Sequence, residues 1–302
     1  MNPSYISIMP KFLWRIVTEY LTCTDIDKMI TVTKNFDQFL SDKGFKCWFH
    51  HISTSIVIVK CKTKVMDNFW KHACYNHISC NNFDNMLKLI SDDNYVRSKH
   101  THKEFIYYKV FINSGRYIYA TEDGSRFIYN FTECSIEIIG CKDNKPIIYE
   151  RPNTVDTMII CPQHFSIKNM IFDSNIDFFE TLCMDDPHTV SYFHVSNCEF
   201  NGEYLHVCMI DNVHIVNCVF NSSHVSITET SRYNPLPLMV KYVISNNIFF
   251  NNMSFCTKID GNKYDSKSTI TISDNIAINS SILCKNSIED QSILHITNNI
   301  IN

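Results

Sequence analysis

The sequence predicts an α+β, multidomain chain of 302 residues: a small N-terminal unit of three helices (1–50), a mixed helical linker (51–115) and a C-terminal right-handed parallel β-helix (116–302). Two observations predict this organisation. Near the N-terminus, apolar residues recur at helical spacing. In the C-terminal half, a phrase rich in Ile, Val and Phe alternates apolar and polar residues and returns several times, which is typical of strands in a repeat architecture.

Residues 9–51 read as short helices. Pro10 is well placed to start the first helix, and Thr24 followed by Asp27 is a capping signal for the second. A third helix follows, and together they make a very small core. The apolar residues on these helices are Leu13, Val17, Tyr20, Leu21, Ile26, Met29, Ile30, Phe36, Phe39 and Leu40.

The same stretch resembles an F-box. The family pattern runs here without a gap as Met9-Pro10, Leu13-Trp14, Val17, Tyr20-Leu21, Asp25-Ile26, Met29, Val32-Thr33, Phe36, Phe39, Ser41-Asp42 and Phe45. Met9, Thr33 and Phe36 replace the usual Leu, Cys and Trp. The resemblance covers about 15% of the chain, and an ordinary three-helix cap on a β-helix is the alternative.

An F-box implies a partner. In the family, the motif docks on the Skp-type adaptor of a cullin-RING ubiquitin ligase by burying apolar side chains. The resemblance therefore assigns adaptor binding to Pro10, Leu13, Trp14, Val17, Tyr20, Leu21, Ile26, Met29 and Val32.

We expect two helices in the linker, at 67–76 and at 104–113, because both stretches resemble helices that often follow an F-box. His72, Cys74, His77 and Cys80 lie close together, but their spacing does not match the usual zinc pairs. Helix packing is the favoured interpretation and zinc the alternative; we expect no metal and no cofactor. From Tyr117 the pattern changes to that of strands, as expected for the first coils of the β-helix.

The repeated phrase is clearest in "FHVSNCEF" (193–200) and "VHIVNCVF" (213–220). Its Asn or Asp marker recurs at positions 169, 197, 217, 246, 274 and 298. The mean spacing of about 26 residues suits one coil of a parallel β-helix, whereas a propeller blade needs about 40 or more. The alternative is chance, because the whole chain is rich in Ile and Asn.

Stacked coils predict stacked side chains. The marker suits a left-handed backbone conformation, and its side chain can bond to the same residue one coil along. The core ladder is expected to comprise Ile167, Val195, Ile215, Ile244, Ile272 and Ile296.

An F-box followed by these repeats resembles the F-box proteins with carbohydrate-binding-type, pectin-lyase-like β-helix repeats. The phrases also resemble, more weakly, the β-helical large early transforming protein of adenoviruses and its capsid-bound relative. The chain is rich in Ile, Asn, Lys, Tyr and Phe, as expected from an AT-rich genome. With this composition, the resemblance points to a viral origin and to a host–virus interaction.

Composition limits the location and the partners. The chain is 45% hydrophobic and 19% charged, has no stretch long enough for a membrane span, and does not begin like a signal peptide. We expect a soluble protein in the cytoplasm or nucleus, of the host cell if viral, with no membrane partner. Its 14 cysteines would then be reduced thiols, with Cys198 and Cys218 at packing positions of the repeat.

Charge argues against a nucleic-acid partner. Residues 1–110 carry 15 Lys/Arg and 10 Asp/Glu, whereas the remainder carries 12 and 21. Phosphate backbones are bound by clustered Lys and Arg, and the repeat region is acidic.

Three classes of function follow. The first is a substrate receptor that docks on the ligase through residues 9–45 and presents a target protein on the lateral face of the β-helix. The second is a β-helix carbohydrate-active enzyme, for which Asp185 and Asp186 beside His188 are the candidate group. A solvated loop is the favoured interpretation of that group. The third is a viral structural protein.

The last phrase ends at Ile301, and no helix or charged segment follows it in this sequence. An uncovered coil presents unpaired backbone groups and the apolar end of the stack. We therefore expect the C-terminal coil to join a partner, either the target protein or a second copy of the chain.

Overall fold

The computed structural model describes residues 56–61, 77–80, 82–98, 105–119, 128–131, 134–149, 158–161, 163–173, 176–180, 192–202, 204–208, 210–221, 224–229, 240–250, 255–259, 268–278 and 294–301. The N-terminal unit predicted over residues 1–50 lies outside these ranges and stays a prediction.

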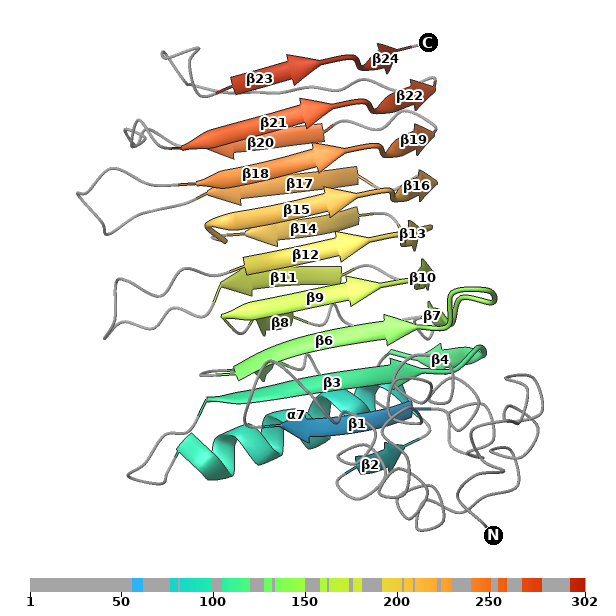
Figure 1. Cartoon of the computed structure of the whole chain (residues 1–302), viewed down its shortest axis with the longest axis vertical. Coiled ribbons are helices and arrows are strands. Elements are labelled where there is room, and N and C mark those ends of the chain that lie inside the picture. The colour runs from blue at the N-terminus through green and yellow to red at the C-terminus, as the bar shows by residue number, and fades with distance from the viewer. Residues whose placement is uncertain are drawn as a thin grey trace, which may run out of the picture.

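The described strands form three sheets that run side by side along one stack (Figure 1). The 10-stranded sheet contains, in spatial order, β2 (His77–Cys80), β1 (Ile56–Cys61), β3 (Ile106–Ile112), β6 (Cys134–Gly140), β9 (His164–Lys168), β12 (Tyr192–Ser196), β15 (Asn212–Val216), β18 (Lys241–Ser245), β21 (Thr269–Ser273) and β23 (Leu294–Thr297).

The 8-stranded sheet contains β24 (Ile300–Ile301), β22 (Ile276–Ile278), β19 (Ile248–Phe250), β16 (Val219–Asn221), β13 (Glu199–Phe200), β10 (Ile171–Asp173), β7 (Ile147–Tyr149) and β4 (Arg116–Ile118). The 6-stranded sheet contains β20 (Phe255–Ile259), β17 (His224–Glu229), β14 (Tyr204–Cys208), β11 (Ile176–Glu180), β8 (Met158–Cys161) and β5 (Ile128–Asn130).

Successive coils pair in parallel from β3 onward, which makes the region a β-solenoid and confirms the predicted β-helix. The predicted right-handed sense stays a prediction. Strand β3, inside the range assigned to the linker, already belongs to this ladder because it pairs with β6.

The Asn or Asp marker makes the corner between the first and second sheets. Asn169, Asn197, Asn217, Asn246, Asp274 and Asn298 all have φ between 53° and 58°, as the sequence predicted. Asn and Asp tolerate this left-handed conformation better than other residues with a Cβ. Bonds between markers also form: Asn197 Nδ2 donates to Asn169 Oδ1 at 2.7 Å, and Asn298 Nδ2 donates to Asp274 Oδ1 at 3.2 Å.

Alternation along each strand sends one set of side chains into a dry interior. In register, the interior positions of β9, β12, β15, β18, β21 and β23 align Ile167, Val195, Ile215, Ile244, Ile272 and Ile296 in one column. The first five members of this column are at most 2% exposed. The last Phe of the phrase forms a second column, in which Phe172, Phe200, Phe220 and Phe249 stack with centroids 5.0–5.2 Å apart.

A row of buried amides runs beside the aliphatic column, at the position after the marker. This amide ladder consists of Asn247, Asn275 and Asn299, and the first two are fully buried. Asn247 Nδ2 donates to Asn275 Oδ1 at 3.0 Å, and Asn275 Nδ2 donates to Asn299 Oδ1 at 2.9 Å. The amides also donate to strand carbonyls one coil earlier, so their polar atoms stay hydrogen-bonded inside the core.

The N-terminal end of the stack is covered. Helix α7 (Phe83–Ser98) begins at a cap in which Asn82 Oδ1 accepts a bond from the Asp84 amide at 2.9 Å. Its side chains at helical spacing, Phe83, Met86, Leu87 and Ile90, are buried against the first strands. In the same place β1 pairs antiparallel with β2 and β3, so Figure 1 shows the bottom of the stack closed by a helix and a hairpin.

The helix predicted at 104–113 is wrong, because this segment contains strand β3. Burial alternates along its sequence IYYKVFI: Ile106, Tyr108, Val110 and Ile112 are buried while the residues between them face outward. The Tyr-Lys pair resembles the helices that often follow an F-box, but a seven-residue run of β-branched and aromatic side chains around one Lys favours a strand.

Candidate interaction surface on the outer face of the solenoid

The outward side chains of the 10-stranded sheet bring together residues far apart in sequence. Strand register places His164 of β9 beside Tyr192 of β12, and Tyr192 beside Asn212 of β15. The next outward column aligns Ser166, His194 and His214. This lateral face is where the sequence led us to expect a bound target.

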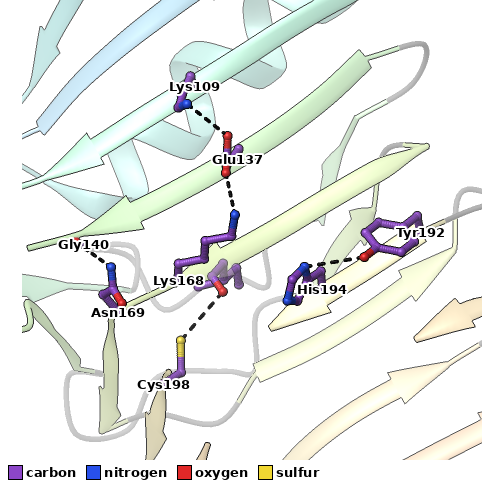
Figure 2. Close-up of polar contacts among 9 residues, drawn as sticks. Lys109, Glu137, Gly140, Lys168, Asn169, Tyr192, His194 and Cys198 are labelled. Carbon is purple, nitrogen blue, oxygen red and sulfur yellow. Dashed lines mark hydrogen bonds and ion pairs between the residues drawn. The ribbon is translucent and has the colours of Figure 1, made fainter. Parts of the chain in front are cut away.

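Four rings gather here and are called the ring cluster: His164, Tyr192, His194 and His214. The Tyr192 ring lies between those of His164 and His214, with both centroid distances 5.3 Å. The His194 ring lies 6.1 Å from that of Tyr192 and 6.1 Å from that of His214. The Tyr192 hydroxyl and His194 Nδ1 are 3.5 Å apart, and Figure 2 draws this contact as a dashed line.

Lysine and glutamate side chains border the ring cluster. Lys168 Nζ lies 2.8 Å from Glu137 Oε1, and Lys109 Nζ lies 3.4 Å from Glu137 Oε2, so one carboxylate links three strands (Figure 2). Burial alone would raise the pKa of Glu137, but the bond and charge of Lys168 and the charge of Lys109 outweigh it and lower that pKa. The carboxylate is therefore ionised at neutral pH.

His194 and His214 are neutral at pH 7. Burial lowers the pKa of His194, and the nearby charge of Lys168, together with that of His214 whenever His214 is protonated, lowers it further. Burial, together with the charge of Lys241, also lowers the pKa of His214. Neutral rings can stack and can both donate and accept hydrogen bonds.

Two polar side-chain atoms beneath this face lack a hydrogen-bond partner. Within the described part of the chain, Ser166 Oγ and His194 Nε2 are buried and have no hydrogen-bond partner. The two residues are direct neighbours across β9 and β12. The exposed parts of the rings and the Lys168–Glu137 pair offer aromatic and charged contacts within a few coils, which is the mixture found at protein interfaces.

The adaptor-binding residues expected from the F-box resemblance, from Pro10 to Val32, all lie outside the described ranges. So do Asp185, Asp186 and His188. Of the four residues for which zinc was the alternative interpretation, His72 and Cys74 also lie outside the described ranges.

Cys80, Cys134, Cys198 and Cys218 are free thiols inside the core. Cys80 ends β2, and burial raises its pKa to about 11, so it is protonated. Cys198 and Cys218 are buried next to their markers, and each Sγ lies within 3.4 Å of a strand carbonyl oxygen. Burial raises the pKa of Cys218 well above its ordinary value. These positions agree with the packing role expected from the sequence.

The sequence reasoning missed the ring cluster and the amide ladder. His194 and His214 stand at the outward position of the two clearest phrases, and that shared position was the available signal. The amide ladder was signalled by doublets, since Asn246-Asn247, Asp274-Asn275 and Asn298-Asn299 each follow a strand. The first member makes the corner and the second turns into the core.

Comparison with protein-family models, with curated proteins and with solved structures found no match to this chain. Among the described residues, no group of three or more His, Cys, Asp and Glu side chains is placed to hold a metal ion. No helix in the described ranges is both long and apolar enough to cross a bilayer.

Proposed function

We propose that this protein is a non-catalytic substrate receptor of a Skp-cullin-F-box ubiquitin ligase, acting as a viral factor that redirects host ubiquitination. Residues 9–45 dock on the Skp-type adaptor. The solenoid holds the target protein on its outer face, around the ring cluster. The proposal rests on one combination: an F-box-like sequence pattern in the same chain as a rigid ladder with this mixed aromatic and charged face.

The outer face supports the receptor half of the proposal. The backbone of the solenoid is held by strand pairing on both sides, and the interior columns lock the strands in register. Side chains on such a surface are presented without a large loss of conformational freedom on binding, which favours affinity. Tyr192 and the flanking imidazoles supply large contact area with few rotatable bonds, a property of interface hot spots.

The adaptor half is tested by co-purification. The full chain, mixed with purified Skp-type adaptor and cullin, should form a stoichiometric complex. Replacing both Pro10 and Leu13 by Ala should abolish it, because each buried Leu-sized side chain contributes roughly 1.5–3 kcal/mol. Lys11→Ala is the matched control, since Lys11 lies between the two but is not part of the pattern. Full binding by the double variant would refute the F-box assignment.

The receptor half is tested by separating the two functions. Tyr192→Ala combined with His214→Ala should remove the target proteins that co-purify with the wild-type chain, while the adaptor and the cullin still bind. Thr271→Ala is the control, because Thr271 occupies the same outward column as His214 two coils further on. If the double variant retains every co-purifying protein other than the adaptor and the cullin, the ring cluster is not the target site.

A further inference from the structure

Two buried cysteines, Cys198 and Cys218, occupy the same position on consecutive coils, directly after the corner marker. The residues that follow them, Glu199 and Val219, are partners in the pairing of β13 with β16. The Val219 N–H also donates to the Cys198 carbonyl at 2.9 Å. Because neighbouring strands lie about 4.7–4.9 Å apart, the Cα atoms of the two cysteines fall within the range of about 4.4–6.8 Å that a disulfide requires.

The two thiols share one orientation inside the core. Each Sγ lies near the carbonyl oxygen two residues earlier, 3.4 Å from that of Ser196 for Cys198 and 3.3 Å from that of Val216 for Cys218. Cys218 Sγ also lies 3.9 Å from the Val195 carbonyl oxygen, which belongs to the coil of Cys198. Burial, and then a hydrogen bond between the two thiols, raises the pKa of Cys218 well above its ordinary value. The two sulfur atoms are therefore neighbours in the reduced protein.

This pair of cysteines lies where the two strands of the ring cluster end. Cys198 follows β12, which carries Tyr192 and His194, and Cys218 follows β15, which carries His214. The ring of His214 lies 5.3 Å from that of Tyr192 and 6.1 Å from that of His194, so these contacts cross from one strand to the other. A covalent bond between the cysteines joins the two coils that carry these rings.

We propose that Cys198 and Cys218 are a redox pair, which hydrogen peroxide oxidises to a disulfide that locks these two coils together. One thiol loses its proton and attacks the peroxide: an S–O bond forms, the O–O bond breaks, and the released hydroxide takes up the proton and leaves as water. The second thiol attacks the sulfenic sulfur, so that the S–S bond forms, the S–O bond breaks and a second water leaves. Two electrons pass from the two thiols to one peroxide, and exchange with an added dithiol reverses the reaction.

Burial determines when the pair reacts. The attacking species is a thiolate, which burial disfavours at Cys218, and both side chains are at most 1% exposed. The pair therefore stays reduced in a reducing compartment, and a small oxidant reaches it through local opening of the corner. Once formed, the disulfide closes a loop that spans one coil, which restricts the unfolded chain and stabilises the folded one.

The proposal does not depend on adaptor or target binding, and it is tested on the purified 302-residue protein. The reduced chain is treated with hydrogen peroxide while circular dichroism verifies that it stays folded, and the remaining thiols are then blocked with N-ethylmaleimide. Cleavage after Glu203, which lies between the two cysteines, should yield peptides that stay joined until dithiothreitol separates them. Fragmentation in the mass spectrometer should identify Cys198 and Cys218 as the linked residues. The urea midpoint should rise on oxidation and return to its first value on reduction.

Cys218→Ala is the test variant and Cys134→Ala the matched control, since each removes one buried thiol. Only Cys218→Ala should abolish the joined peptides and the rise in urea midpoint. In the oxidised wild-type protein, amide hydrogen exchange in β12 and β15 should be slower than in the reduced protein. Unreacted thiols, oxidation to sulfinic acid without a link, a link to another cysteine, or a disulfide that forms only in urea would each overturn the proposal. So would a disulfide that leaves hydrogen exchange in both strands unchanged.

Discussion

Removing one residue from the amide ladder is the sharpest test of what holds the solenoid together. Asn275 is fully buried. Its side chain donates to the Ile244 carbonyl at 3.0 Å and to Asn299 Oδ1 at 2.9 Å, and it accepts from the backbone and side-chain amides of Asn247 at 3.0 Å each. The substitution Asn275→Ala removes all four bonds at once.

The expected loss follows from the groups left behind. A buried donor or acceptor without a partner costs about 1–3 kcal/mol, and the Asn247 backbone N–H and the Ile244 carbonyl lose the partner that Asn275 supplied. We expect the free energy of unfolding to fall by about 3–4 kcal/mol, a large share of the total of a typical domain.

Asn201→Ala is the matched control. Asn201 also belongs to a row of amides, donating to Asp173 at 2.7 Å and accepting from Asn221 at 2.9 Å, but it is exposed. Water can replace its bonds, so the loss should stay within about 0.5 kcal/mol.

Equilibrium urea unfolding followed by circular dichroism and by fluorescence measures both variants. The two signals must coincide before a single free energy is assigned, because repeat proteins can unfold in parts. Equal losses for Asn275→Ala and Asn201→Ala would refute the role given to burial.

Three further outcomes are expected. Ile215→Asp should unfold the solenoid, because Ile215 is 0% exposed within the aliphatic column. His214→Asp on the outer face should change the free energy of unfolding by about 1 kcal/mol or less. Similar thermal unfolding curves for the two variants would contradict the register. Burial raises the pKa of Asp211 to about 6, so the folded chain binds this proton more tightly than the unfolded chain and loses stability as pH rises from about 4 through 6. Asp211→Asn should therefore raise the free energy of unfolding by about 1–2 kcal/mol at pH 8 and leave it unchanged below about pH 4; a gain that is the same at both pH values would contradict this assignment. Asn217 has φ of 55°, so Asn217→Val should destabilise the chain by about 1–2 kcal/mol and Asn217→Gly should not; urea midpoints that rank Val equal to Gly would count against the left-handed corner.

The β-helix could be predicted from the sequence because a parallel stack makes contacts between equivalent positions of successive coils. Ile215 contacts Val195 and Ile244, so the same residue types return at each coil and the repeat becomes visible in the chain. The corner could also be predicted from the sequence, because its left-handed conformation favours Asn or Asp at one position of every phrase. Local conformation and alternation are short-range properties, and a sequence displays them directly.

Segment 104–113 shows where short-range reasoning failed. Its aromatic residues and Lys109 suit either an amphipathic helix or a strand. The segment is a strand because β6 and β1 pair with β3 on its two sides and its alternate residues are buried. Tertiary pairing outweighs intrinsic preference in such segments.

What the sequence by itself determined is the repeat, its strands and its corners, because each depends on neighbours along the chain. Only the tertiary structure decided which polar residues act together. Asn275 is an ordinary polar residue by composition, and its burial depends on amides 28 residues before it and 24 after it. The ring cluster likewise exists because β9, β12 and β15 stack in register despite unequal connections between them. Strand pairing across coils sets these distances, and no local pattern encodes them.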